Sequence, residues 1–271
     1  MGPGACKVAR VKRPLRGDRW AERLGRVLAA SSADTASWME RHTRLLKTDT
    51  FSRVGLLELQ DQYCFLKLYL AKSALQRSGF RLGYGRGVHS FDAAQQLARA
   101  GLPVPSPLAC LLVEEGMVLL TEGIAHSRDL RSLWLEQPAA GAAQQLMGAA
   151  GGVLAALHRA GFAHGDCKWS NLLWNGTQLY LVDLEAVRAV RAARNRPLPL
   201  HSRQLLDLAR YTVDAEELGA SPAQYSGFMD AYCLGLGCRR ELVSAGMLPA
   251  VEAIRKRHRA TYGRDYPPLV Q

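Results

Sequence analysis

The segment HGDCKWSNLLWNGTQLYLVDLE spans residues 164–185. It places Asp166, Lys168 and Asn171 in one short loop, and an apolar run then leads to Asp183. Phosphoryl transfer requires a carboxylate that orients the attacking hydroxyl, and oxygen ligands that hold magnesium against the phosphates. The spacing therefore predicts this chemistry, with Asp166 as the catalytic carboxylate and with Asn171 and Asp183 as magnesium ligands.

Each of these residues also has an ordinary structural interpretation. Alone, Asp166 would be a loop or capping aspartate, and Asn171 would be a turn residue. The five-residue step between them and the later Asp183 favour catalysis instead. We predict that Lys168 offsets charge on the transferred phosphoryl group, and a solvated lysine is the alternative.

Three further polar residues stand in apolar surroundings. His164 is expected to brace the loop rather than to act as an acid or base, and His158 to be a satisfied core histidine. Lys67 is a lone lysine in the apolar and aromatic segment Phe65 to Tyr69. Strand alternation would point it to solvent, but together with the loop it is predicted to contact the α- and β-phosphates of a nucleotide.

The composition is that of a soluble globular protein, with 271 residues, 48% of them apolar and 22% charged. No apolar run reaches the ~20 residues that span a bilayer. No apolar core follows the basic N-terminus, so a secretory signal is not expected and the cytoplasm is the predicted compartment. The six cysteines include no CxxC pair, which favours reduced thiols and argues against a zinc site.

The formal net charge is +11, with basic residues gathered in the N-terminal arm and again at residues 255–259. This excess favours an anionic partner, either a phospholipid surface, a nucleic acid or a phosphorylated substrate. A solvated basic face is an equal alternative. Aromatic residues do not interleave with either cluster, which disfavours a nucleic-acid partner.

The order of elements predicts an α+β fold in three parts. Residues 1–43 form a basic leader that is partly helical, because apolar residues recur there at helical spacing. Residues 44–122 alternate as strands around one helix, with a loop expected from Gly79 to Val88. Residues 123–271 are mainly helical and carry the loop and the magnesium ligands.

At these residues the chain resembles the protein-kinase-like superfamily from about residue 44 to about residue 215. The segment from His164 to Asn171 resembles the catalytic loop, residues 183–185 the magnesium-binding triplet, and Lys67 the third-strand lysine. The resemblance implies a two-lobed fold with an antiparallel-sheet N-lobe and a mainly helical C-lobe. Within the superfamily the chain is most similar to bacterial lipopolysaccharide kinases, which phosphorylate heptose or Kdo sugars of the inner core. The segments that carry this similarity are FLKLY (65–69), AGLPVP (100–105), LTEG (120–123), HGD (164–166), VDLE (182–185) and LLDLAR (205–210).

The chain also departs from the protein-kinase pattern. There is no Gly-x-Gly-x-x-Gly loop, so contacts to the phosphates of the nucleotide are expected from Thr50, Ser52 and nearby backbone amides. Asp92 is the nearest acid that could pair with Lys67. Gly165 stands where protein kinases have the arginine that contacts a phosphorylated activation loop, and no Ala-Pro-Glu motif follows. These absences argue against a regulated protein kinase.

The resemblance implies an enzyme that uses ATP and Mg²⁺ to phosphorylate a heptose or Kdo hydroxyl of the lipopolysaccharide inner core. Glu122, Gly123 and Ile124 would supply backbone groups to adenine. The basic surface would meet an anionic glycolipid at the inner face of the inner membrane. Two alternatives stay open, a small-molecule kinase of the aminoglycoside or choline type, and a pseudokinase or scaffold that binds lipid or nucleic acid.

Overall fold

The computed structural model describes residues 11–191, 198–263 and 265–271, which form two compact units. The first comprises the chain up to Gln96 together with Pro105–Ala125, and the second comprises Leu97–Val104 and His126–Gln271. Residues 1–10, which include part of the basic arm and Cys6, lie outside the described residues. No helix of the described residues is long and apolar enough to cross a membrane.

The first unit is built on a six-stranded antiparallel sheet in the order β1-β5-β6-β4-β3-β2. The strands are β1 (Val11–Arg16), β2 (Arg44–Asp49), β3 (Ser52–Leu59), β4 (Gln62–Leu70), β5 (Pro107–Val113) and β6 (Gly116–Glu122). Four helices accompany them, α1 (Asp18–Ala29), α2 (Thr35–His42), α3 (Ala74–Arg81) and α4 (Arg86–Arg99). The strands expected within residues 44–122 are confirmed, and β2, β3 and β4 form an antiparallel meander. The described part of the leader contributes β1, α1 and α2 to this unit.

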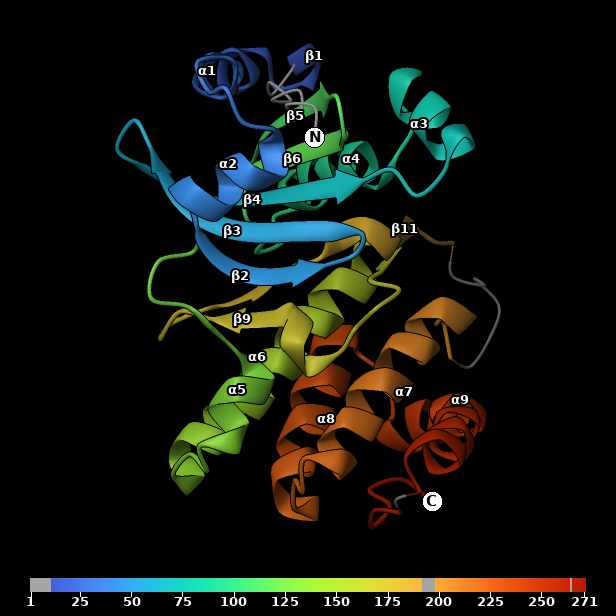
Figure 1. Cartoon of the computed structure of the whole chain (residues 1–271). Coiled ribbons are helices and arrows are strands. Elements are labelled where there is room, and N and C mark those ends of the chain that lie inside the picture. Colours follow the sequence, from blue (N-terminus) through green and yellow to red (C-terminus); the bar gives the residue numbers. More distant parts are fainter. Residues whose placement is uncertain (1–10, 192–197, 264) are drawn as a thin grey trace. The chain divides into compact units, whose positions relative to one another are not determined.

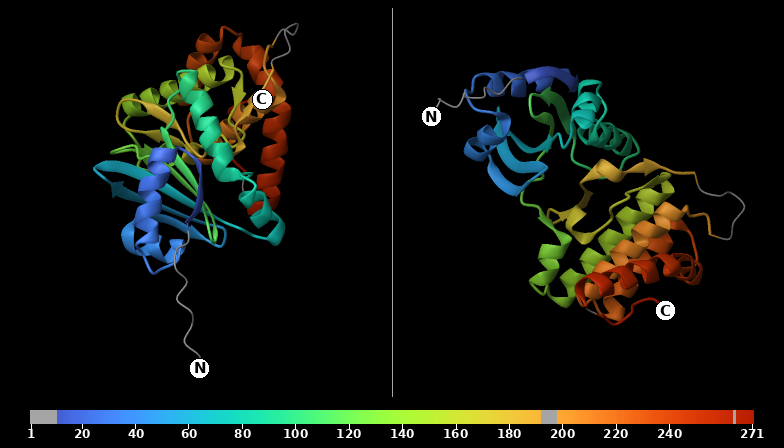
Figure 2. Two further views of the ribbon diagram at one scale, coloured as in Figure 1. Left: turned by 90° about the horizontal axis from the view of Figure 1, so that it is seen from above. Right: turned by 45° about the vertical axis from the view of Figure 1, so that its right-hand side comes forward.

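Successive side chains of a strand point to opposite faces of the sheet, and helices cover both faces. The central strands are therefore apolar on both faces. Leu66 and Leu68 of β4 pack with α1 and α2 on one face of the sheet. Tyr69 lies on the other face, against Phe80 of α3 and Phe91 of α4. Figure 1 and Figure 2 show these helices on the two sides of the sheet. Because the sheet is covered twice, the middle strands read as continuous apolar runs.

One expectation for this unit is wrong. The segment from Gly79 to Val88 is not a loop, because α3 continues to Arg81 and α4 begins at Arg86. Glycine and arginine give the segment the composition of a loop. The side chain of Phe80 is buried in the cluster beside the sheet and holds α3 in place.

The second unit is mainly helical, with short strands around the loop at residue 166. Its helices are α5 (Leu130–Leu135), α6 (Ala140–Arg159), α7 (Ser202–Glu217), α8 (Pro222–Leu236) and α9 (Arg240–Tyr262). Its strands are β7 (Arg128–Asp129), β8 (Phe162–Ala163), β9 (Leu172–Trp174), β10 (Leu179–Leu181) and β11 (Arg188–Ala189). Tyr211 of α7 stacks on Phe228 of α8, with ring centroids 3.9 Å apart. This aromatic core lies under the loop and supports it.

Candidate active site

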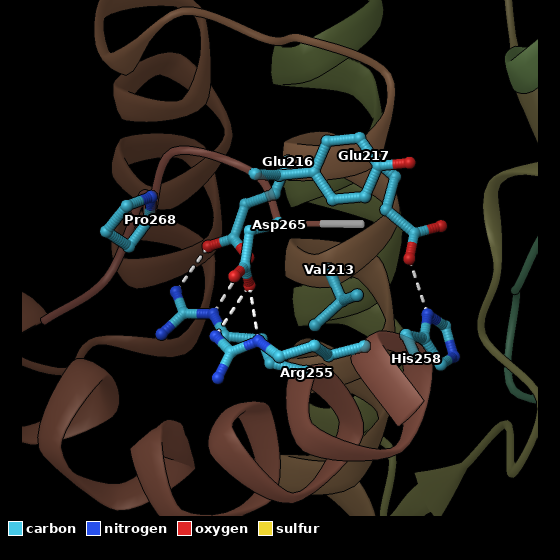
Figure 3. A pocket seen from close by; sticks show the side chains of 9 residues that line it. Val213, Glu216, Glu217, Arg255, His258, Asp265 and Pro268 are labelled. Atoms are coloured by element: carbon cyan, nitrogen blue, oxygen red, sulfur yellow. Dashed lines mark hydrogen bonds and ion pairs between the residues drawn. The ribbon is translucent and has the colours of Figure 1, made fainter. Parts of the chain in front are cut away.

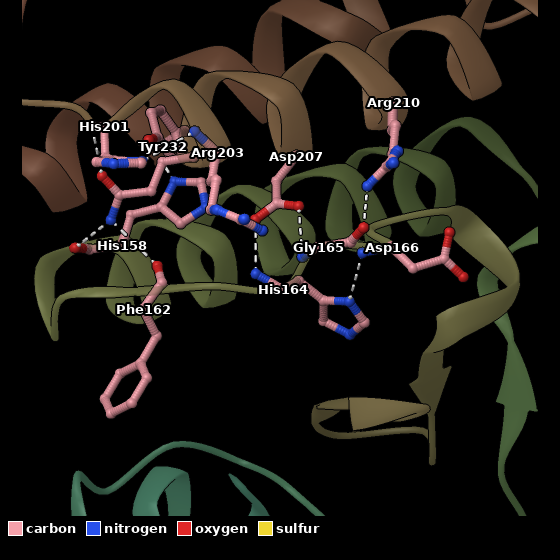
Figure 4. Close-up of polar contacts among 11 residues, drawn as sticks. His158, Phe162, His164, Gly165, Asp166, His201, Arg203, Asp207, Arg210 and Tyr232 are labelled. Carbon is pink, nitrogen blue, oxygen red and sulfur yellow. Dashed lines mark hydrogen bonds and ion pairs between the residues drawn. The ribbon is translucent and has the colours of Figure 1, made fainter. Parts of the chain in front are cut away.

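One buried carboxylate holds the loop of residues 164–171 (Figure 4). Asp207 lies on α7 and is fully buried. Its Oδ2 accepts a hydrogen bond from the N–H of His164 at 2.6 Å, and its Oδ1 accepts one from the N–H of Gly165 at 2.8 Å. Charge-assisted bonds to two successive amides are strong and directional. They fix the backbone immediately before Asp166.

His164 joins the loop to the strand that precedes Asp183. Its Nε2 lies 3.0 Å from the carbonyl oxygen of Val182, and its Nδ1 accepts from the N–H of Asp166 at 3.3 Å. Because a carbonyl can only accept, Nε2 carries the proton and the ring is neutral. Burial lowers the pKa of His164, which keeps it neutral. The geometry gives His164 a bracing role, as the sequence predicts.

Gly165 is required by its surroundings. Its φ is +80°, and a Cβ at this position would lie 2.4 Å from the carbonyl oxygen of Ala186. Arg210 of α7 donates to the Gly165 carbonyl. A larger residue would therefore push the loop away from the segment that follows Asp183.

Asp166, Lys168 and Asn171 come together as the spacing predicts. The Nζ of Lys168 lies 2.9 Å from Oδ2 of Asp166. The Nδ2 of Asn171 donates to the same Oδ2 at 3.1 Å and to the Asp166 carbonyl at 2.9 Å. Both side-chain contacts use Oδ2, and the Asp166 side chain is 39% exposed. The carboxylate is thus oriented by two donors and remains accessible to an acceptor hydroxyl.

Asn171 and Asp183 provide oxygen ligands suited to magnesium. Because Nδ2 of Asn171 donates to Asp166, its Oδ1 is directed to the other side. The N–H of Val182 donates to the Asn171 carbonyl at 3.0 Å, which places the next residue, Asp183, beside it. Asp183 has a φ of +58°, a left-handed conformation that is uncommon for non-glycine residues. The described residues contain no cluster of three or more His, Cys, Asp or Glu that could hold a metal ion, whereas one or two carboxylates plus phosphate oxygens suffice for Mg²⁺.

Besides Asp207, two residues that support the loop were not predicted from the sequence, Trp169 and Asp214. Trp169 is fully buried, and its indole N–H donates to the Tyr211 carbonyl at 3.1 Å. Its backbone N–H donates to Oδ2 of Asp214 at 2.7 Å. Burial raises the pKa of Asp214 to about 6. The available signals were a large apolar residue inside a polar loop and a second aspartate two helical turns after Asp207.

His158 is buried as expected, but only one of its two ring nitrogens has a hydrogen-bond partner among the described atoms. Nδ1 lies 2.7 Å from the hydroxyl of Tyr232. Nε2 has no hydrogen-bond partner among the described atoms and lies 3.5 Å from Oδ2 of Asp207. The histidine therefore lies behind the buried aspartate that holds the loop.

Lys67 lies in the first unit, in β4 between Val54 of β3 and Leu119 of β6. Its Nζ lies 5.1 Å from the ring centroid of Tyr69, on the face covered by α4. Asp92, the nearest acid to Lys67 in the sequence pattern, is engaged by another residue. The Asp92 carboxylate accepts from Nε and Nη2 of Arg16, at 2.8 and 3.0 Å.

The hairpin between β2 and β3 is closed by Asp49. Its Oδ1 accepts from the N–H groups of Phe51 and Ser52, both at 2.8 Å, and its Oδ2 accepts from the Ser52 hydroxyl at 3.0 Å. The hydrogen bond from the Phe51 amide is the largest of the effects that lower the pKa of Asp49. Thr50 is exposed at the tip. Ser52 can meet a phosphate only if Asp49 moves away.

The segment after β6 is also held tightly. The N–H of Glu122 donates to the Ser106 carbonyl at 2.8 Å, and that of Gly123 donates to the Tyr63 carbonyl at 2.9 Å. A Cβ on Gly123 would lie 2.6 Å from the Tyr63 ring. The N–H groups of Glu122 and Gly123 are therefore already used within the first unit, and the Glu122 carbonyl accepts from the Thr121 hydroxyl at 3.1 Å.

A pocket of about 240 Å³ lies in the second unit between α7, α9 and the C-terminal segment (Figure 3). Its charged side chains are paired with one another, Glu216 with Arg255, Glu217 with His258, and Arg259 with Asp265. Glu216 also accepts from the N–H of Leu269 at 2.8 Å. These pairs tie the end of the chain to the helix that carries Asp207.

Among solved structures, the chain is similar to one described as WaaP in complex with acyl carrier protein. The identity is 19%, the TM-score is 0.57, and the match covers 84% of this chain and 93% of that chain. Another match is the PknI kinase domain of Mycobacterium tuberculosis, with 14% identity, a TM-score of 0.42, and coverage of 72% of this chain and 94% of that one. No curated protein matches.

The family comparison covers most of the chain. Residues 34–232 match the family described as Lipopolysaccharide kinase (Kdo/WaaP) family. The match includes Lys67, the whole loop of residues 164–171, Asp183 and Asp207. The chain is therefore a kinase and belongs to the lipopolysaccharide kinase (Kdo/WaaP) family.

Proposed function

We propose that the protein transfers the γ-phosphoryl group of ATP to a hydroxyl of a heptose or Kdo sugar in the lipopolysaccharide inner core. The observation that carries this proposal is the cluster of Asp166, Lys168 and Asn171. The carboxylate of Asp207 holds the backbone of this loop by two hydrogen bonds. The family match supports a lipopolysaccharide acceptor over the aminoglycoside and choline alternatives. It also disfavours the pseudokinase alternative.

Asp166 orients the sugar hydroxyl and accepts its proton as the phosphoryl group is transferred. Two nitrogen donors on Oδ2 keep the carboxylate in one rotamer, which leaves Oδ1 for the acceptor. Lys168 is 45% exposed on its side chain and offsets the charge that develops on the transferred group. Asn171 and Asp183 would hold the magnesium ion that neutralises the phosphates.

The nucleotide contacts come from the first unit. Lys67 is proposed to contact the α- and β-phosphates, and the backbone of Glu122, Gly123 and Ile124 to face adenine. Thr50 and Ser52 would cover the phosphates. For Ser52 this requires release of the Asp49 contacts, so nucleotide binding is expected to rearrange the hairpin tip.

The acceptor determines where the protein works. A lipopolysaccharide carries acyl chains and resides in a membrane, so we propose that the protein acts in the cytoplasm at the inner face of the inner membrane. The formal charge of +11 supports attraction to an anionic surface. Acyl carrier protein is a second candidate partner, because the chain shares the fold of the WaaP structure described with it.

A panel of acceptors tests the proposal. ATP consumption is measured with dephosphorylated core lipopolysaccharide, with aminoglycosides, with choline and with a generic protein, each with and without a magnesium chelator. We expect chelator-sensitive turnover with the lipopolysaccharide alone. Turnover on aminoglycoside or choline but not on the glycan would replace the proposal with the small-molecule alternative.

A further inference from the structure

The segment that runs from β4 through α3 to α4 exposes large apolar side chains. Leu75 is 84% exposed, Leu82 is 71% exposed and Tyr84 is 73% exposed. Leu75 lies in α3, and Leu82 caps its C-terminal end in a helical backbone conformation. The two are seven residues apart, which is about two helical turns, so they lie on the same side. Exposed apolar residues gathered in this way indicate an interaction site more than scattered ones do.

The helix is anchored to its unit through one buried side chain. Phe80 is 2% exposed and packs in the cluster that contains Phe91 and Met117. Figure 1 and Figure 2 show α3 at the outer margin of the first unit, beyond the end of β4. The opposite face of α3, with Leu75 and Leu82, is therefore directed to solvent.

The same segment also carries exposed cations. Residues 71–91 contain no aspartate or glutamate. Lys72, Arg77 and Arg81 are exposed, and no ion pair joins any of them to a carboxylate of the described residues. This segment is thus basic and has no acidic residue of its own. We call Leu75, Leu82, Tyr84, Lys72, Arg77 and Arg81 the α3 patch.

A helical segment that exposes both leucines and cations fits a bilayer surface. Leucines enter the boundary between headgroups and acyl chains, while arginine and lysine side chains reach back to anionic headgroups. A tyrosine at the edge suits the same boundary, since its ring is apolar and its hydroxyl is polar. An acidic protein would match the cations, but it would not require two leucines on a protruding face.

We propose that the α3 patch docks the protein on an anionic phospholipid bilayer. The inference rests on the proposed function in one respect, because a lipopolysaccharide acceptor is embedded in such a bilayer. It assigns the docking surface to α3 rather than to the basic residues 255–259 or to the N-terminal arm.

Cosedimentation of the full chain with vesicles tests the inference without nucleotide or sugar. The vesicles contain phosphatidylethanolamine with phosphatidylglycerol, and vesicles of phosphatidylcholine serve as the uncharged comparison. We expect binding to the anionic vesicles alone. The double variant Leu75→Ser and Leu82→Ser, and separately Arg77→Glu and Arg81→Glu, should each weaken binding about tenfold or more.

Matched controls distinguish the effect of the α3 patch from the loss of any exposed leucine and from the change in net charge. Leu234 is 85% exposed on α8, so Leu234→Ser removes an equally exposed leucine elsewhere. The pair Lys256→Glu and Arg257→Glu makes the same change of charge on α9. Both controls should bind as the wild type does, and all variants should keep the wild-type melting temperature and the turnover on deacylated, water-soluble core oligosaccharide.

Two results would overturn the inference. One is wild-type protein that does not bind the anionic vesicles, which would leave a protein partner as the occupant of the patch. The other is an equal loss of binding in the α9 pair and in the α3 pair, since net charge alone would then explain attachment. Either result leaves kinase activity on the soluble oligosaccharide unaffected, so it is distinguishable from a failure of the proposed function.

Discussion

At the scale of single residues, the site depends on how Asp166 is oriented. Lys168 and Asn171 both contact its Oδ2, and the amides on its N-terminal side are held by Asp207. The spacing in the sequence predicted the members of the cluster. It did not predict Asp207 or Asp214 as supports, because those contacts join residues more than forty positions apart.

Replacing the catalytic carboxylate isolates its chemical role. Asp166→Asn keeps the volume and can still accept a hydrogen bond, but it cannot take a proton. We expect kcat to fall about 10²- to 10⁴-fold with little change in KM for ATP. Steady-state kinetics check this, and an activity near that of the wild type would remove Asp166 from its assigned role.

The buried anchor is expected to matter for stability as well as activity. Asp207→Asn leaves one carbonyl oxygen for two N–H donors and turns an amide group toward one of them. An unsatisfied buried donor costs about 1 to 3 kcal/mol, so the free energy of unfolding should fall by that amount. Urea unfolding measures it, and the exposed Asp230→Asn on α8 is the control that should change little.

At the scale of elements, α7 connects the loop to the C-terminal helix. It carries Asp207 and Asp214 toward the loop, and Glu216 toward Arg255 of α9. A mainly helical region was predicted for residues 123–271, but the sequence does not reveal that three acidic residues of α7 have different partners.

The ionisation of Asp214 predicts a pH dependence. Burial raises its pKa to about 6, from an ordinary value of about 3.9. Because the folded state binds the proton more tightly, this stabilisation is complete below about pH 4 and is lost as the pH rises through about 6. The wild type should lose up to about 3 kcal/mol of unfolding free energy relative to Asp214→Asn between these limits. Unfolding curves of the wild type and of Asp214→Asn at pH 4 and pH 7 measure this difference. A wild type that gains stability relative to the variant between pH 4 and pH 7 would contradict the prediction.

The Glu216–Arg255 pair is expected to hold the C-terminal segment. The Glu216 side chain is 2% exposed and that of Arg255 is 22% exposed. Glu216→Ala leaves a largely buried guanidinium without its partner, which costs about 3 to 5 kcal/mol. The exposed Glu22→Ala, from a pair with Arg26, should cost less than about 1 kcal/mol. Equal losses in denaturant titrations would contradict this account of the pocket.

At the scale of the whole molecule, the α+β class and the order of strands before helices were predictable. β3 and β4 were predictable because each is a largely apolar run bounded by polar turns. β1 was missed because Lys12, Arg13 and Pro14 interrupt its apolar pattern. β1 is an edge strand, and an edge strand accommodates charged residues and proline. The segment around α3 was misjudged because the burial of Phe80 against distant strands cannot be read from its glycines and arginines.

Transfer of phosphate from ATP to dephosphorylated core lipopolysaccharide is the most direct test of the central claim. The wild type and Asp166→Asn are compared in single turnovers, and the product is located by mass spectrometry of the released core. We predict one phosphate on a heptose or Kdo sugar with the wild type, and a much slower appearance of the same product with the variant. Absence of a phosphorylated core sugar with the wild type, under conditions where ATP and magnesium are bound, would contradict the account.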